Sequence, residues 1–227
     1  MYDANTAHYF KSELKRHGVD CQGIRVLEFG FGNGTFLGFA RDHGAEVTGV
    51  EVQDVLLARA AKKQFHVYNT LDNIQAVYSA HSFDLIAAFD VFEHLSPQES
   101  IAALTQMKQL AKPGALLIAR FPNGDSPFSL PLQHGDYTHK IALGKGCVDQ
   151  IFHQGGWDVR YLGEPTWTFL NFRSRVKHSV RHMLRRGLEK IVMALYFGNT
   201  PPATFYHNYI LAASPSSTKT LPAQIVN

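Results

Sequence analysis

Three glycines and two acids stand where they could hold a ligand. The segment VLEFGFGNGTFL places Glu28 two residues before Gly30, and Gly32 and Gly34 follow at steps of two. Glycine lets the chain turn sharply and offer bare backbone amides, which a Cβ would obstruct. A second acid, Glu51, ends the apolar run AEVTGVE, where a carboxylate can accept hydrogen bonds from both hydroxyls of a ribose. The pattern predicts a site for a cofactor that contains a nucleoside.

The spacing and charge of this loop separate two kinds of cofactor. A dinucleotide fingerprint that begins at Gly30 needs its third glycine at position 35, where the chain has Thr35. A pyrophosphate prefers amides and cations, whereas a sulfonium-bearing amino acid tolerates nearby carboxylates such as Glu28 and Asp90. The loop therefore favours an adenosyl sulfonium over a nicotinamide dinucleotide.

The elements that must position these residues alternate along the chain. Short β-rich runs occupy Ile24–Phe29, Ala45–Glu51, Phe65–Tyr68, Phe83–Phe89, Ala115–Phe121, Trp157–Leu162 and Thr204–Ala213. Helical patterns occupy Gly34–His43, Asp54–Lys63, Pro97–Leu110, Lys145–Gln154 and Phe172–Tyr196. This alternation is typical of crossover units on a parallel sheet and predicts a doubly wound α/β fold. The run from Phe121 to Gly144 is predicted to be a long functional loop.

Composition limits the class of protein. The 227 residues are 45% hydrophobic and carry a formal net charge of +3, which by itself indicates no polyanionic partner. The sequence shows no signal peptide and no stretch that could span a bilayer, and Cys21 and Cys147 form no CxxC pair. We expect a cytoplasmic chain with one domain over 1–213, a helical cap in 1–20 and a flexible tail at 214–227.

Several ordered motifs resemble one enzyme family. The E-x-G-x-G-x-G loop, the acid that ends the second strand, FDLIAAFDVFEHL and KPGALLIARFPN are together similar to the class I S-adenosyl-L-methionine-dependent methyltransferases, in the small-molecule group of type 11 and 23. The resemblance covers about residues 22 to 165. It implies a Rossmann-like seven-stranded sheet with an antiparallel last strand, and S-adenosyl-L-methionine as the cofactor. It also implies a cofactor site made of Glu28, Gly30, Gly32 and Gly34 around the methionine part, Glu51 and Val52 at the ribose, Thr70 and Leu71 near the adenine, and Asp90 near the methionine amino group.

Two histidines are candidates for the acceptor side. A hydroxyl that receives a methyl group must lose its proton, and a positioned base is worth about 10²–10⁴ in rate. His139, in the loop GDYTHKIAL, is predicted to be this base, with Asp136 as an orienting or second proton-accepting group. His94, after the fourth strand, is the second candidate. Each could instead serve local packing or bond backbone.

A metal site is not expected. His134, Asp136 and His139 could in principle bind a divalent ion, but their spacing matches no compact ligand pattern. The other histidines are scattered along the chain.

Residues 172–197 are predicted to form a basic helical insertion. Val176, Val180, Leu184, Leu188, Ile191 and Leu195 recur at helical steps beside seven Lys or Arg residues. The simplest interpretation is a helix docked on its own domain or on the second subunit of a homodimer. Attachment to an anionic membrane surface, or contact with a phosphate-bearing substrate, are the sharper alternatives.

The function expected from these observations is O-methylation of a small molecule, with a sugar in glycan biosynthesis as the leading acceptor. N-methylation of a small amine is the near alternative. A module that binds the cofactor without catalysis is an alternative from another class. Nucleic acid is not an expected partner, because Asp90-Val91-Phe92-Glu93 lacks the two prolines that enzymes methylating base amines usually carry there.

Overall fold

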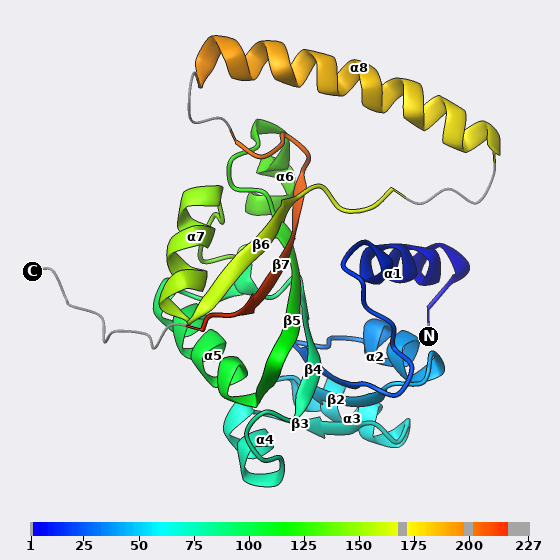
Figure 1. Cartoon of the computed structure of the whole chain (residues 1–227), viewed down its shortest axis with the longest axis vertical. Helices are drawn as coiled ribbons and strands as arrows, with labels where there is room; N and C mark the ends of the chain where they lie inside the picture. The colour runs from blue at the N-terminus through cyan, green and yellow to red at the C-terminus, as the bar shows by residue number, and fades with distance from the viewer. Residues whose placement is uncertain (1, 168–171, 198–201, 218–227) are drawn as a thin grey trace, which may run out of the picture.

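The computed structural model describes residues 2–167, 172–197 and 202–217. Its centre is a seven-stranded sheet in the order β3-β2-β1-β4-β5-β7-β6 (Figure 1). The strands are β1 (Arg25–Phe29), β2 (Glu46–Val50), β3 (His66–Tyr68), β4 (Phe83–Phe89), β5 (Ala111–Pro122), β6 (Trp157–Gly163) and β7 (Asn208–Pro215). β7 runs antiparallel to both of its neighbours, and the other pairs are parallel. The predicted Rossmann-like sheet with an antiparallel last strand is thereby confirmed.

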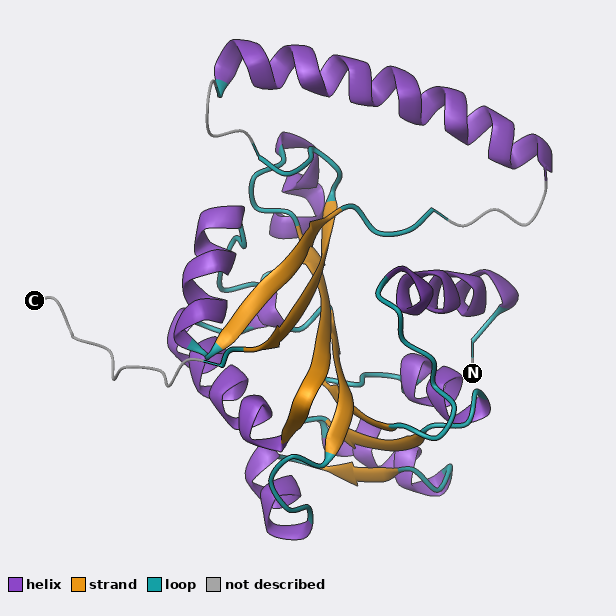
Figure 2. Cartoon of the chain, in the orientation of Figure 1, coloured by secondary structure: helices purple, strands orange, loops and turns teal. Residues whose placement is uncertain are grey.

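Helices cover both faces of this sheet (Figure 2). Those described are α1 (Ala4–Arg16), α2 (Thr35–Asp42), α3 (Asp54–Lys62), α4 (Leu71–Val77), α5 (Pro97–Leu110), α6 (Leu130–His134), α7 (Lys145–Gln154) and α8 (Phe172–Tyr196), with short 3₁₀ turns η1 (Phe92–His94) and η2 (Pro127–Ser129). One apolar cluster joins the sheet to α4, α5 and α7, and a second joins it to α1, α2 and α3. Neighbouring strand residues such as Val26 and Leu27 enter opposite clusters, as the two-residue period of a strand requires.

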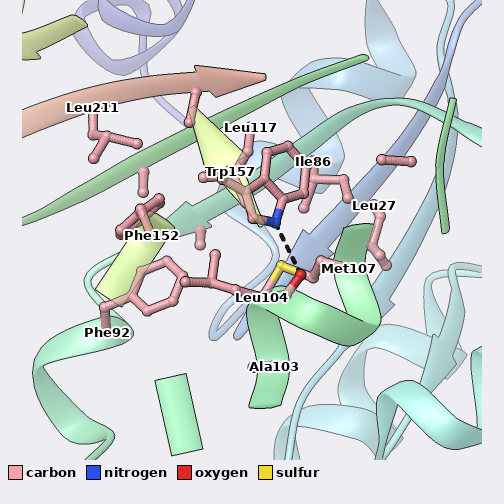
Figure 3. Packing of buried hydrophobic residues seen from close by; sticks show 14 of the residues in the cluster. Leu27, Ile86, Phe92, Ala103, Leu104, Met107, Leu117, Phe152, Trp157 and Leu211 are labelled. Carbon is pink, nitrogen blue, oxygen red and sulfur yellow. Dashed lines mark hydrogen bonds between the residues drawn. The ribbon is translucent and has the colours of Figure 1, made fainter. Parts of the chain in front are cut away.

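Trp157 anchors the first of these clusters at the start of β6. Its ring is 1% exposed, and its indole N–H donates to the Leu104 carbonyl of α5 at 2.9 Å (Figure 3). Phe92, Phe152 and Met107 belong to the same apolar cluster. A buried indole with its only donor satisfied combines a large apolar area with a fixed position, so this contact fixes α5 against the start of β6.

Most predicted elements agree with the structure to within one or two residues, but four regions differ. The fifth strand was predicted to begin at Ala115, whereas β5 already begins at Ala111, which pairs with Phe83 before a register shift. Gly114 (φ +82°) makes the turn inside that irregular step. Helix α4, which Thr70 caps, was not predicted.

The third difference is the start of the last strand, predicted at Thr204 and observed at Asn208. The Asn123 side-chain amide donates to the carbonyls of Thr204 and Tyr206, both at 2.8 Å. These backbone groups therefore bond a side chain instead of a neighbouring strand.

The segment between β5 and α7, predicted to be one long loop, contains η2 and α6. Its two ends meet in a parallel bridge between Asn123 and Leu143. The Gly124 amide donates to the Leu143 carbonyl at 3.1 Å, and a Cβ on Gly124 would come within 2.6 Å of the Gly144 nitrogen. We call this closed segment, residues 123–144, the acceptor loop. Glycine at its neck allows the two strands of chain to approach each other this closely.

Helix α8 lies at one end of the molecule's longest axis, set apart from the sheet (Figure 1). Glu164, after β6, accepts from Arg185 and, at 3.2 Å, from Arg186. Arg185 also donates to the buried Glu189 at 2.9 Å. These charged contacts attach one face of α8 to the domain. None of the helices in the described parts of the chain combines the length and apolar character needed to cross a membrane.

The predicted tail at 214–227 falls mostly outside the described residues. Ser214 and Pro215 belong to β7, and Ser216 donates its amide to the Gly156 carbonyl at 2.8 Å. The described part of the predicted tail is therefore tied to the sheet.

Candidate active site

A cavity of about 1180 Å³ opens at the carboxyl ends of β1, β2, β4 and β5. Its lining includes the glycine loop, Glu51, Asp90 and His94, together with residues of α1 and of the acceptor loop. The carboxyl edge of a doubly wound sheet is where such folds bind ligands. The volume is sufficient for a cofactor with a small acceptor beside it.

The glycine loop leaves β1 through a series of left-handed turns. Gly30, Gly32 and Gly34 have φ angles of +70°, +53° and +71°. Residues with a Cβ rarely adopt this left-handed region. A Cβ on Gly30 would collide with the Val91 side chain, whereas a Cβ on Gly32 would meet no atom within 4 Å. Gly30 is therefore needed for close packing, and Gly32 for backbone conformation beside open space. Gly34 caps α2 and does not line the cavity.

Glu51 is fixed by three backbone amides. Its Oε2 accepts from Gly32 at 3.0 Å, and its Oε1 accepts from Val52 and Gln53 at 2.9 and 3.1 Å. A carboxylate can accept about four hydrogen bonds, so about one position stays available for a ligand hydroxyl. The cavity wall at Glu51 and Val52 thus fits one hydroxyl of a ribose.

Glu28 lies beneath the glycine loop and is fully buried. It accepts from the Leu37 amide at 3.0 Å, in the first turn of α2, where the helix dipole favours an acid. Burial raises the pKa of Glu28 well above its ordinary value, and the nearby Glu51 raises it further. The residue links β1 to α2 and lines the cavity floor.

Asp90 has a partner that the sequence analysis missed. Arg120, at the carboxyl end of β5, donates Nε to Asp90 Oδ1 at 2.9 Å and a second N–H to Oδ2. The Arg120 guanidinium also lies 5.6 Å from the Tyr9 ring of α1, and burial raises the pKa of Tyr9 to about 12. The arginine in IARFPN, one strand away from Asp90 in a parallel sheet, was the signal for this pair.

The backbone at Asp90 is unusual as well. Asp90 has φ +57°, which is uncommon for a residue other than glycine and often marks a functional position. The bidentate arginine leaves the Asp90 carboxylate with less capacity for a cofactor amine than the sequence suggested. Both side chains line the cavity.

Thr70 and Leu71 lie outside the cavity lining. The Thr70 hydroxyl accepts from the Asn73 amide at 3.2 Å and caps α4, and Leu71 is 4% exposed within the apolar core. Their predicted place near an adenine rests on their position after β3.

His94, Thr138 and Asp136 form a chain of hydrogen bonds at the cavity wall. The Thr138 hydroxyl donates to Asp136 Oδ1 at 2.7 Å, and the same hydroxyl oxygen lies 2.9 Å from His94 Nδ1. These bonds lower the pKa of Asp136. Because Thr138 has one proton and gives it to Asp136, His94 must donate from Nδ1 and keep the lone pair on Nε2. Sequence reasoning found both ends of this chain and missed Thr138.

His139 and Glu93 complete this group. The His139 ring meets the His94 ring edge-on at a centroid distance of 4.7 Å, and its Nδ1 lies 3.0 Å from the Gln133 carbonyl oxygen. That carbonyl can only accept, so His139 also carries its lone pair on Nε2. Glu93 is 2% exposed, and burial raises its pKa to about 8. Glu93 lies in the first turn of η1, and the sequence did not mark it as a site residue.

The same group has the composition of a cation site. Glu93, His94 and His139 each offer one ligand atom, and these atoms lie within 4.8 Å of one another. The set differs from the one that the sequence suggested, because it replaces His134 and Asp136 by two consecutive residues of η1.

Comparisons with known proteins identify a family for this chain. A family model described as a methyltransferase domain matches residues 2–190. An uncharacterized methyltransferase of Geobacillus kaustophilus is 32% identical over 102 residues, which are 44% of this chain and 47% of that protein. The matched stretch thus spans about half the length of this curated relative.

Solved structures share the fold. A SAM-dependent methyltransferase from Archaeoglobus fulgidus has a TM-score of 0.64 at 22% identity, over 91% of this chain and 93% of that chain. Magnesium protoporphyrin IX methyltransferase from Synechocystis, solved with bound SAM, has a TM-score of 0.56 at 17% identity, over 93% of this chain and 78% of that chain. At these identities the likeness shows the fold alone.

Proposed function

The chain belongs to the class I S-adenosylmethionine-dependent methyltransferases, and on this premise we propose that it methylates a hydroxyl group of a small molecule or sugar. The observation that carries the proposal is a single cavity lined both by the glycine loop with Glu51 and by His94 with Asp136 and Thr138. The first set fits the cofactor, and the second provides groups that can take a proton from an acceptor.

The bound cofactor supplies an electrophilic methyl group on a sulfonium. The new O–C bond forms as the C–S bond breaks, and the electron pair leaves on sulfur. The main task of the protein is to hold the acceptor oxygen in line with the methyl carbon. Asp90 and Arg120 frame the cavity between the glycine loop and the acceptor loop, and we assign them the orientation of both ligands.

In this proposal, the acceptor hydroxyl transfers its proton to the group formed by His94, His139 and Asp136. His94 has the best access, because it lines the cavity and its Nε2 carries a lone pair. Thr138 holds the ring through Nδ1, and the Asp136 carboxylate stabilises the positive charge that a protonated ring would carry, as in an oriented base. His139, which packs against His94, is our second candidate for the base.

The finer proposal concerns the acceptor. A sugar offers several hydroxyls, and the cavity presents polar side chains that could bind them: Asn5 and Thr6 of α1, and Thr138 and Lys140 of the acceptor loop. A neutral amine would need no strong base, so the oriented histidine favours O-methylation over N-methylation. We propose glycan assembly in the cytoplasm as the setting, where Cys21 and Cys147 would stay reduced.

The test is methyl transfer from isotopically labelled cofactor to a panel of nucleotide sugars, phenols and small amines. We expect labelled products from hydroxyl compounds, and calorimetric binding of S-adenosylmethionine in preference to NAD. Label on amines alone would replace the proposal by N-methylation. Cofactor binding with no product from any acceptor would support a binding module without catalysis.

Helix α8 supports a second proposal, about location. Five apolar residues at helical spacing lie along its outer side and are half or more exposed: Val180, Leu184, Leu188, Ile191 and Leu195. Arg181 and Lys190 are exposed beside them. An apolar stripe next to cations is the pattern of a helix that lies in the plane of a membrane surface.

We propose an anionic lipid surface as the partner of this stripe. The segment Phe172–Tyr196 carries seven Lys or Arg residues and one Glu, so a second copy of the same helix would meet it with like charge. Binding to such a surface would bring the protein close to lipid-linked sugars.

Sedimentation with liposomes tests this second proposal. We expect the protein to sediment with vesicles that contain phosphatidylglycerol and not with phosphatidylcholine vesicles, and the paired substitution Leu184→Gln with Leu188→Gln to abolish sedimentation. The matched control is Val77→Gln, at another exposed apolar position. No sedimentation by the wild-type protein, or dimerisation that the double variant abolishes, would overturn it.

A further inference from the structure

One buried carboxyl group at the acceptor end of the site is incompletely hydrogen-bonded. Glu93 is 2% exposed, yet within the described structure its Oε2 has no hydrogen-bond partner. A buried carboxyl oxygen without a partner is costly, and proteins satisfy such groups with a donor, a water or a cation.

The neighbours of Glu93 are two potential metal ligands. His94 is the next residue of η1, and the Lys140 amide donates to the Glu93 carbonyl at 2.8 Å, which holds the adjacent His139 close to η1. The three ligand atoms lie within 4.8 Å of one another. Tetrahedral coordination with bonds of about 2.0–2.1 Å needs ligand atoms about 3.3 Å apart, so the widest pair would close by at most about 1.5 Å.

Both imidazoles are held in the tautomer that metal binding needs. His139 gives its Nδ1 proton to the Gln133 carbonyl, and His94 gives its own to Thr138, which Asp136 fixes. Each Nε2 therefore keeps a lone pair that these two hydrogen bonds do not use. Histidine ligands in proteins almost always have their other nitrogen bonded to a carbonyl or carboxylate in this way.

We propose that Glu93, His94 and His139 bind one divalent transition-metal ion next to the cavity, which His94 lines. Two imidazole nitrogens and one carboxylate oxygen suit zinc, iron or cobalt better than magnesium or calcium. Three protein ligands also leave a coordination position open, as in catalytic metal sites.

This inference deepens the proposed function and rests on it for its catalytic meaning. A hydroxyl bound at the open position would lose its proton more easily, because the ion stabilises the oxygen anion. Asp136 lines the cavity and is not a ligand in this arrangement, so it stays available to take that proton. The oxygen would then attack the methyl carbon as described above.

The test is direct metal binding by the full chain, with any affinity tag removed and bound metal stripped by a chelator. We expect one equivalent of Zn²⁺ by calorimetry, and one equivalent of Co²⁺ with the visible absorption of an imidazole-ligated ion. Glu93→Gln and His139→Asn should each weaken binding at least tenfold and change the Co²⁺ spectrum.

His134→Gln is the matched control, because this exposed histidine of α6 belongs to the same loop and not to the ligand group. Its binding and spectrum should equal those of the wild type. Circular dichroism checks that each variant is folded. If Glu93→Gln does not fold, the result for His139→Asn decides the test.

Two results would overturn the inference: no stoichiometric binding of either ion, or equal loss in the ligand variants and in His134→Gln. Neither measurement needs cofactor or acceptor. A failure here would leave the methyl-transfer proposal standing, with His94 as the base in a metal-free site.

Discussion

The two ends of the cavity satisfy their buried acids in different ways. Glu51, at the cofactor end, receives three backbone amides from its own strand end and from the glycine loop. Glu93, at the acceptor end, is just as buried and has an oxygen without a partner in the described structure. Local backbone thus completes the first end, whereas the second end depends on side chains from a distant loop and on a ligand. The difference shows that the polar groups of a binding site can all be hydrogen-bonded before the ligand arrives, whereas those of a reacting site can stay unpaired until it does.

The largest effect should follow from a change at the acceptor end. His94→Gln removes the lone pair of Nε2 and should lower turnover on a confirmed hydroxyl acceptor by about 10²–10⁴. Cofactor affinity measured by calorimetry should stay within about threefold of the wild type, because the cofactor end is untouched. A parallel loss of affinity would show that the two ends are not separable. His134→Gln, an exposed neighbour, serves as the control.

The next prediction concerns a substitution at the cofactor end. Glu51→Gln keeps the shape but replaces one accepting oxygen by a donor that opposes the amides of the loop, and we expect cofactor affinity to fall about 10- to 100-fold. Calorimetric titration with S-adenosylmethionine measures it. Glu46→Gln, on the same strand but exposed and paired with Arg25, should leave affinity unchanged. Equal effects of the two substitutions would contradict the assignment.

A backbone change should test how rigid the cofactor end is. Gly30→Ala places a Cβ against Val91 in a left-handed conformation, and it should lower the free energy of unfolding by about 2–4 kcal/mol. Gly114→Ala has a similar φ and no atom within 4 Å of its Cβ, so it should cost only about 1 kcal/mol. Denaturant titration compares them. Equal costs would show that the contact with Val91 is unimportant.

The remaining prediction concerns the pH dependence of stability. Burial raises the pKa of Glu93 from 4.5 to about 8, so the folded protein keeps a proton that the unfolded chain loses above pH 4.5. Stability from this group is present below about pH 4.5 and is lost as pH rises toward 8. In chelator-treated protein, Glu93→Gln should therefore gain stability relative to the wild type, by about 1–3 kcal/mol between pH 5 and pH 8.5. Denaturant titration at both pH values measures the gain, and a difference that does not change with pH would mean that Glu93 finds a partner in solution.

The same contrast decides what the sequence could reveal. The turn from β1 to α2 joins residues close together in the chain, so glycine spacing and the acid at 51 could be recognised from the sequence as a candidate cofactor site. Arg120 and Thr138 escaped notice because Asp90 and His94, which they contact, lie 30 and 44 positions earlier in the chain, and no periodic pattern links them. Glu93 was not singled out because its burial depends on the packing of η1 beneath the acceptor loop.

Secondary structure shows a similar division. Pro97–Leu110 was predicted to the residue because its signals are local: Ser96 and Glu99 form a capping box, and Pro97 stands at the first helical position. The start of β7 was misplaced because the Asn123 side chain, 81 residues before Thr204, takes the carbonyls that a strand would use. Long-range contacts of this kind leave no mark on the nearby sequence.

The closed neck of the acceptor loop has a consequence for how such enzymes diversify. Asn123 and Leu143 hold the strand exit and the helix entry together whatever lies between them. Insertions, deletions and exchanges within the enclosed residues would leave β5 and α7 in register, and with them the cofactor edge. Evolution, or a protein engineer, could therefore exchange this stretch as a cassette and obtain a new acceptor preference on an unchanged methyl donor platform.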